Sequence, residues 1–281
     1  MNEEVKGLKK SLVMAIIGII LFLISATGVT YAWFSLSGRA HTNVTPMGGT
    51  ISEGDTVLQI STSYNGPFDK ECNLVINGQG GDLRPVSTLD LEHFYRVIMQ
   101  DDSGMALLYE NADKDVDKDT IHGTVYLKCL NVPCDVYFNR DDLKLGSDIQ
   151  TLAAMRLGMK ITSHAGTTIY VFKLDELGDT ALAQQTATVP DDNTVVSSIS
   201  KKGKATYAND ISESILSYMA VPVNNGKEYG AGSNLLVKLD ADEVATVEYW
   251  LYLEGCDKNC INPVQNRDMD ISLAFAGVDV E

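Results

Sequence analysis

The feature that most constrains the fold of this chain is a long uncharged apolar segment near its N-terminus, Ser11–Val29. A helix rises about 1.5 Å per residue, so a helix over this segment nearly covers a hydrocarbon core of about 30 Å. A helix packed on a soluble core usually keeps a polar stripe over such a length, and this segment has none. We therefore expect one N-terminal hydrophobic helix that is separate from the fold of the remaining chain.

Charges on either side of the apolar segment predict its orientation. Lys6, Lys9 and Lys10 precede it, and the next lysine in the sequence is Lys70. Positive charge collects on the cytoplasmic side of membrane helices. The sequence therefore predicts a cytoplasmic N-terminus and places everything after Tyr31 outside the membrane.

Two interpretations of residues 1–32 are open, a signal peptide and a signal anchor. The apolar region of a signal peptide usually has about 7–15 residues, and this one is longer, which favours a retained anchor. The segment Thr30-Tyr31-Ala32 has small residues at the two positions that a signal peptidase reads, which favours cleavage between Ala32 and Trp33. Both interpretations predict an exported domain over residues 33–281.

The exported part is strongly acidic. The chain of 281 residues has a formal net charge of −16, and its first 32 residues contribute 3 − 2 = +1, so the remainder carries −16 − 1 = −17. Such a surface repels phosphate backbones and anionic lipid headgroups. The composition therefore argues against a nucleic-acid partner. Its hydrophobic content of 44% is that of a globular protein and not of a disordered one.

The exported part reads as short strands separated by turn residues. Apolar alternation or β-branched enrichment marks the ranges 56–62, 93–100, 104–110, 123–130, 134–139, 156–162, 167–174, 243–254 and 269–278. Three pairs of these ranges flank short turns and predict hairpins over 93–110, 123–139 and 156–174. A helical pattern stands out at 148–154. We expect an all-β fold, a β-sandwich or jelly roll with a few short helices.

Residues 175–235 are richer in Asp, Ser, Asn and Gly, and we expect them to form a long insertion with short helical pieces.

Trp250 and Tyr252 alternate with leucines on the strand with the strongest pattern, 243–254. A strand that is buried on both faces needs bulky residues facing both ways, so we expect these aromatic rings to pack in the core.

The five cysteines all lie in the exported part. Cys129 and Cys134 flank a short turn, and Cys256 and Cys260 share one loop, so each pair predicts a disulfide in an oxidising exterior. Cys72 is left over. Two alternatives are open: free thiols, and a four-thiolate zinc site if the two loops meet.

A run of aspartates at every second position, Asp113, Asp115 and Asp117, has the spacing of a calcium loop. Lys118 stands where such a loop needs glycine, and Thr124 stands where it needs glutamate. We therefore expect a solvated loop here, with weak calcium binding as the alternative.

Catalytic signatures are absent from the sequence. The four histidines, His41, His93, His122 and His164, form no pair with metalloprotease spacing. A nucleophile elbow, a phosphate-binding loop and a dinucleotide-binding glycine pattern are also missing. The sequence predicts a protein that is not an enzyme and has no cofactor, the weak calcium site aside.

Three short stretches resemble one family. Gly28–Ser35 (GVTYAWFS) resembles the processing region of the TasA/camelysin group of Firmicutes surface proteins. Tyr249–Cys260 (YWLYLEGCDKNC) resembles a W-L-E-G-x-D-x-x-C motif of clostridial relatives with the same N-terminus, and Leu83–Thr88 (LRPVST) resembles a third shared element. The resemblance implies processing by a dedicated signal peptidase near Ala32 and Trp33. It also implies export to the surface of a Gram-positive bacterium.

The resemblance further implies an extracellular structural subunit of a cell-surface or biofilm-matrix fibre. Fibres of that group form when the N-terminal strand of one subunit inserts into the next, and the donor here would be residues 33–44 with Trp33, Phe34 and Leu36 as its bulky groups. The alternative is a membrane-anchored, monomeric module that binds carbohydrate or protein, with Trp33 and Phe34 in an interfacial aromatic belt. A pilin-like subunit is a third interpretation, but the apolar segment lacks the expected glutamate.

Overall fold

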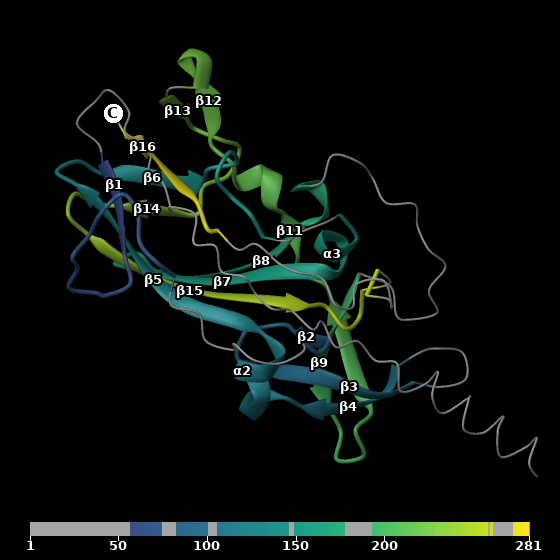
Figure 1. Ribbon diagram of the computed structural model, residues 1–281. Coiled ribbons are helices and arrows are strands. Elements are labelled where there is room, and N and C mark those ends of the chain that lie inside the picture. The colour runs from purple at the N-terminus through teal and green to yellow at the C-terminus, as the bar shows by residue number, and fades with distance from the viewer. Residues whose placement is uncertain are drawn as a thin grey trace, which may run out of the picture. The chain divides into compact units, whose positions relative to one another are not determined.

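The computed structural model (Figure 1) describes residues 57–74, 83–100, 106–145, 149–177, 193–226, 228–257, 259–260 and 272–280. All of them belong to the compact unit Phe34–Glu281. The predicted helix Ser11–Val29, the cleavage site Ala32–Trp33, and the donor residues Trp33, Phe34 and Leu36 lie outside the described residues. Within the described ranges, no helix is both long enough and apolar enough to span a membrane.

The largest sheet has the strand order β1-β5-β15-β7-β8-β11. Its strands are β1 (Val57–Ser61), β5 (Ile121–Leu130), β15 (Val244–Leu253), β7 (Met155–Ser163), β8 (Gly166–Lys173) and β11 (Glu213–Ser214). The first five pair in antiparallel fashion, and β11 runs parallel to the end of β8. We call this six-stranded sheet the main sheet. It confirms the all-β class that the strand patterns predict.

A second sheet packs on one face of the main sheet. It has the order β14-β6-β16, with β14 (Val237–Leu239), β6 (Cys134–Phe138) and β16 (Phe275–Asp279). The Phe138 ring of β6 meets the Phe172 ring of β8 edge-on, with 5.3 Å between the centroids, and stacks on Phe275. Gly277 allows close approach, because a Cβ added there would lie 3.0 Å from the Cβ of Leu58 in β1.

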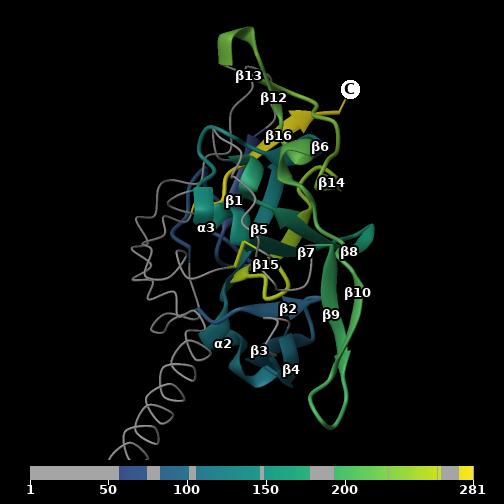
Figure 2. The same ribbon diagram turned by 90° about the vertical axis from the view of Figure 1, so that its right-hand side faces the viewer.

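A third sheet, β2-β3-β4, covers part of the opposite face of the main sheet (Figures 1 and 2). It consists of β2 (Val86–Thr88), β3 (Phe94–Gln100) and β4 (Ala106–Asn111). Its residues Val86 and Phe94 pack against Tyr252 of β15, with Trp250 at the margin of the cluster. Tyr252 is fully buried, which confirms the expected core packing for this ring, whereas Trp250 is half-buried against the same cluster.

The burial pattern of β15 follows this layering. Residues Val244–Trp250 alternate between half-buried and mostly buried side chains, and Leu251–Leu253 are buried without interruption. The alternation ends where the third sheet covers the face of β15 that lies opposite the second sheet. A strand with both faces covered keeps apolar residues at successive positions, which explains the continuous apolar run YWLYL.

The remaining elements are short. Helical pieces are η1 (Asp113–Asp115), α2 (Val116–Asp119), α3 (Ile149–Ala154), η2 (Asp175–Leu177), η3 (Ile215–Tyr218) and η4 (Asn224–Gly226). Two hairpins, β9 (Thr194–Ile199) with β10 (Ala205–Asn209) and β12 (Val221–Val223) with β13 (Glu228–Gly230), lie within the predicted insertion 175–235. The helix predicted at 148–154 is confirmed by α3.

Two of the three predicted hairpins are confirmed, β3 with β4 and β7 with β8. The third is wrong, because β5 and β6 belong to different sheets. The register explains the difference: over Tyr126–Lys128, β5 pairs with β1 on one side and with β15 on the other. Both edges are occupied there, so the chain turns at Asn131 (φ 68°) and crosses to the second sheet.

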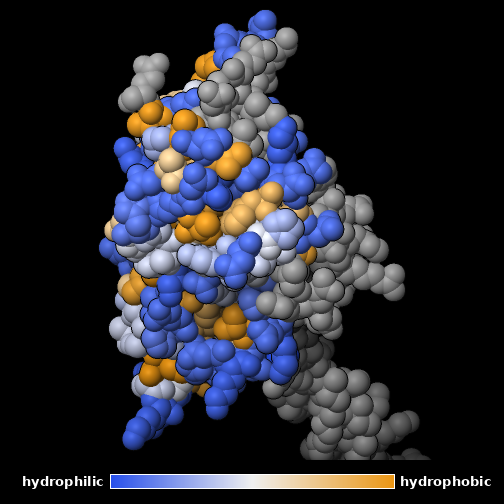
Figure 3. Space-filling view, turned by 90° about the vertical axis from the view of Figure 1, so that its left-hand side faces the viewer, coloured by the Kyte–Doolittle hydropathy of each residue, from blue (hydrophilic) through white to orange (hydrophobic). Residues whose placement is uncertain are grey.

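The surface is hydrophilic over most of the face that Figure 3 shows, with small separate hydrophobic areas. Large exposed apolar side chains in the described ranges come from several separate parts of the chain, for example Tyr64, Ile98 and Val221. Scattered apolar side chains of this kind are normal on a soluble surface.

Candidate functional site

The predicted bond between Cys129 and Cys134 is present in the structure. Both residues are fully buried, Cys129 at the end of β5 and Cys134 at the start of β6. The bond therefore joins the main sheet to the second sheet and does not close a hairpin. It also removes two of the four thiolates that the zinc alternative requires.

The other cysteines are free thiols in the structure. Cys256 and Cys260 are buried and are not joined to each other, in contrast to the disulfide that their shared loop predicts. Burial raises the pKa of the Cys256 thiol to about 12 and raises that of Cys260 as well. A protonated, buried thiol is a poor nucleophile, so these two behave as core residues. Cys72 is partly buried.

The three aspartates of the candidate calcium loop, Asp113, Asp115 and Asp117, each have a different partner. Asp113 accepts the backbone N–H of Phe94 at 2.7 Å. Asp115 pairs with the Arg96 guanidinium at 3.0 Å, and Asp117 faces the His122 ring at 3.1 Å. These residues form η1 and α2 and not an open loop. The structure therefore does not gather their carboxylates around one point.

The W-L-E-G-x-D-x-x-C stretch begins in β15, and its residues Glu254–Asp257 continue beside a buried arginine. Arg156 of β7 is 1% exposed and donates to the Asp257 carboxylate at 2.6 Å and to the Ser212 hydroxyl at 3.2 Å. The Asp210 carboxylate lies 3.7 Å from the same guanidinium. Arg156 also donates to the carbonyl of Met155 at 3.0 Å. This guanidinium thus ties β7 to the turn after β15 and to the segment before β11.

Glu254 extends this network toward the third sheet. Its backbone N–H donates to the carbonyl of Ala154 at 3.0 Å, and its carboxylate accepts the N–H of Cys256 at 3.0 Å. Burial raises the pKa of the Glu254 carboxyl to about 8, with Arg156 acting in the opposite direction. The next residue, Gly255, donates its N–H to Val86 of β2 at 2.9 Å. The motif residues therefore have structural partners, and we call Arg156, Asp210, Glu254 and Asp257 the buried ion network.

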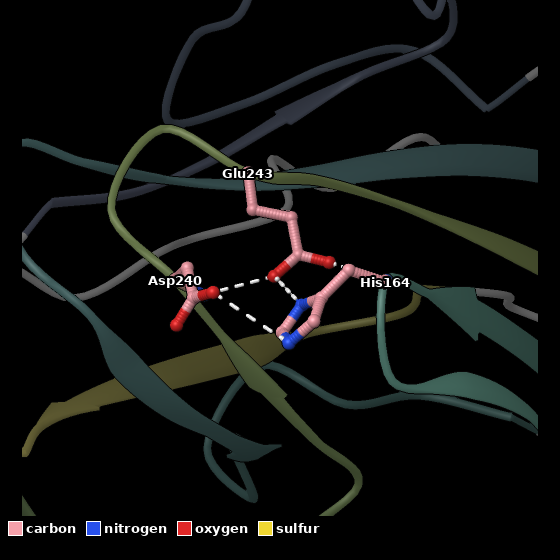
Figure 4. A group of neighbouring side chains, drawn as sticks. All are labelled: His164, Asp240 and Glu243. Atoms are coloured by element: carbon pink, nitrogen blue, oxygen red, sulfur yellow. Dashed lines mark hydrogen bonds and ion pairs between the residues drawn. The ribbon is translucent and has the colours of Figure 1, made fainter.

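A second group lies at the surface, where two turns meet (Figure 4). His164 occupies the turn between β7 and β8, and Asp240 and Glu243 occupy the connection between β14 and β15. The His164 Nδ1 lies 2.7 Å from a Glu243 oxygen, and its Nε2 lies 3.5 Å from an Asp240 oxygen. One ligand atom from each residue falls within 4.8 Å of the others. In the described part of the chain this is the one group of three that could hold a metal ion.

Backbone groups hold Glu243 in place. Its carboxylate accepts the N–H of His164 at 2.7 Å and the N–H of Asp240 at 2.9 Å. Burial raises the pKa of Glu243, but these bonds and the imidazole outweigh it and lower the pKa. The hydrogen bond to Glu243 in turn raises the pKa of the His164 imidazole. The group is thus preorganised, with negative charge directed at one imidazole.

Sequence reasoning missed this group. The turn at His164 lies in a correctly predicted hairpin, and Asp240 and Glu243 precede a correctly predicted strand. The missing information is the register: Thr162 of β7 pairs with Thr246 of β15, which brings the two turns to the same end of the sheet. The sequence carries no short motif for that register, because the two turns are far apart in the chain.

Comparisons of the chain with protein-family models, with curated proteins and with solved structures find no match.

Proposed function

We propose that this chain is an extracellular structural subunit of a cell-surface or biofilm-matrix fibre, in which residues 33–44 of one copy pair with a sheet edge of the next. Trp33, Phe34 and Leu36 supply the bulky side chains of that donor strand. An extended segment gains backbone hydrogen bonds when it joins an open sheet edge. The proposal draws on the sequence resemblance and on one structural observation, an unpaired edge of β8.

β8 forms the open edge for most of its length. It pairs with β7 from Gly166 to Lys173 on one side. On its other side β11 pairs with Phe172 and Lys173, and within the described ranges no strand pairs with Gly166–Val171 (Figure 2). An edge of this kind is a template for another strand.

The register of β7 and β8 indicates which backbone groups face outward. Ser163 and Gly166 flank a two-residue turn, so they are expected to form a hydrogen-bonded pair. Hydrogen-bonded and non-hydrogen-bonded pairs alternate in an antiparallel ladder, which turns the backbone groups of Thr167 and Ile169 away from β7. Thr167 and Thr168 are exposed and Ile169 is 38% exposed, so an incoming strand has access to this edge.

The outer side of β5 over Ile121–Val125 also lacks a partner strand among the described residues. This stretch directly follows α2 in the chain, and the side chains of Ile121 and Val125 are buried. The edge of β8 therefore supports the proposal better.

We propose that the main sheet and the β14-β6-β16 sheet form the jelly-roll-like sandwich of the resembled group, and the contact of Phe138 with Phe172 supports it. We further propose export to the surface of a Gram-positive bacterium, with cleavage by a signal peptidase after Ala32. The formal charge of −17 after residue 32 fits a structural role without nucleic-acid partners.

Electron microscopy tests the proposal. Purified Trp33–Glu281 is imaged by negative stain at increasing concentration beside a version that starts at Thr45. Filaments from the first version and separate particles from the second are expected, because only the first has the donor segment. Separate particles from both would instead favour a membrane-anchored monomeric module that binds carbohydrate or protein.

A further inference from the structure

The surface group of His164, Asp240 and Glu243 differs in its charge from two other carboxylate clusters of the described chain, the one around Arg96 and the buried ion network. Arg96 is 2.5 Å from Asp119 and 2.7 Å from Glu110, so a guanidinium neutralises that cluster. Arg156 does the same in the buried ion network.

At the surface group, by contrast, no lysine or arginine of the described residues lies within ion-pair distance of Asp240 or Glu243. The nearby Lys128 pairs with Asp242 at 3.0 Å. Two carboxylates therefore face a single imidazole. Even when that imidazole is protonated, its one positive charge does not balance the two negative charges of Asp240 and Glu243.

We propose that His164, Asp240 and Glu243 bind a divalent transition-metal ion of the zinc class, with water completing the coordination. Imidazole and carboxylate together form a ligand set that suits zinc, whereas calcium and magnesium prefer oxygen ligands alone. Zinc bonds of about 2.0–2.2 Å place two tetrahedral ligands about 3.3–3.5 Å apart. The His164 Nε2 and the Asp240 oxygen are already 3.5 Å apart, and all three ligand atoms lie within 4.8 Å.

The position of the group determines what the ion does. His164 lies in a turn of the main sheet, and Asp240 directly follows β14 of the second sheet. Glu243 precedes β15, which returns the chain to the main sheet. A bound ion therefore clamps the ends of two sheets together. Because it binds the folded chain, it raises the melting temperature as its concentration rises.

Isothermal titration calorimetry tests the proposal on the full-length chain, freed of metal and held in mild detergent without chelating buffer. Zinc ion is titrated alone, and calcium ion is titrated in parallel. We expect one zinc ion per chain, no comparable heat from calcium, and a rise in melting temperature with zinc. His164→Ala and Asp240→Asn are each expected to weaken zinc binding at least about tenfold, since changes to supporting partners alone cost about 10–100-fold.

Two variants control for charge and for thiols. Asp242→Asn removes a carboxylate from the same connection, and asparagine tolerates its positive φ of 62°. Cys72→Ser removes the free cysteine that is not fully buried. Both are expected to bind zinc as the native chain does. Absence of saturable zinc binding, or equal affinity in native chain and His164→Ala with near-UV circular dichroism unchanged, would overturn the proposal. So would an equal loss in Asp242→Asn.

Discussion

At the scale of single residues, the buried ion network is the most demanding feature of the fold. One guanidinium, that of Arg156, faces the carboxylates of Asp257 and Asp210 in a region without water access. Buried charges are tolerated where they are paired and hydrogen-bonded, and removal of one partner leaves the others uncompensated. The stability of the fold is therefore expected to depend on this arginine and on the protonation of Glu254.

Substitution of Arg156 by methionine is expected to lower the free energy of unfolding by about 3–5 kcal/mol, because it leaves buried carboxylates without a counterion. Lys173→Met is the control, since Lys173 is 3.8 Å from the same Asp210 carboxylate but is partly exposed. Its effect is expected to stay below about 1 kcal/mol. Urea denaturation of both variants measures the difference. Equal stability of Arg156→Met and the native chain would show that the network is dispensable.

The protonation of Glu254 makes stability depend on pH. Its pKa rises from 4.5 to about 8 in the folded state, so the folded chain holds a proton that the unfolded chain releases between these values. This contribution to stability is complete below about pH 4.5 and is lost as the pH rises to about 8, with a slope of at most about 1.4 kcal/mol per pH unit.

Glu254→Gln is expected to remove that slope, since glutamine does not titrate and still accepts the N–H of Cys256. Urea midpoints at pH 5, 6, 7 and 8 measure it, beside Glu248→Gln as a change of the same type within β15, which ends directly before Glu254. The slope of the native chain should persist in Glu248→Gln. An unchanged slope in Glu254→Gln would assign the proton to another group.

At the scale of elements, the Cys129–Cys134 bond is a short covalent link between two sheets. The two residues are separated by 5 positions, and the loop-entropy model gives about 2 kcal/mol for a loop of this size. Replacement of both by alanine is expected to lower the free energy of unfolding by about that amount. Cys72→Ala serves as the comparison, with little expected change. A loss in the double variant no larger than that of Cys72→Ala would mean that packing alone holds the two sheets together.

The elements also show how far the sequence predicts the fold. Alternation and turn residues are local signals, and they predict β1, β3, β4, β7, β8 and β15 closely. Pairing is not local: the sequence places β5 and β6 in one hairpin, whereas β5 already has two neighbours over Tyr126–Lys128. The same limit hides the group of His164 and Glu243, which exists because of the register between β7 and β15.

The buried ion network depends on a long-range contact in the same way. Its residues Glu254 and Asp257 stand in a recognisable sequence stretch, but the sequence predicts a disulfide between Cys256 and Cys260 of that stretch. The structure gives both cysteines a buried environment and gives Asp257 an arginine from β7. Nothing local in the sequence connects Arg156 to that turn, which is 101 positions away.

At the scale of the whole molecule, we propose that the outer edge of β8 accepts the N-terminal strand of another copy. Proline at an outward-facing position removes the N–H that the incoming strand needs and leaves the pairing with β7 in place. Ile169 occupies such a position. Ile169→Pro is therefore expected to block assembly without unfolding the chain, and Ile169→Thr, which keeps the N–H, is the matched control.

The most direct measurement is negative-stain electron microscopy of Trp33–Glu281 as the native sequence, as Ile169→Pro and as Ile169→Thr. Circular dichroism melting of each variant accompanies the images. We expect filaments from the native sequence and from Ile169→Thr, and separate, folded particles from Ile169→Pro. Filaments of normal abundance from folded Ile169→Pro would contradict the assignment of β8 as the accepting edge.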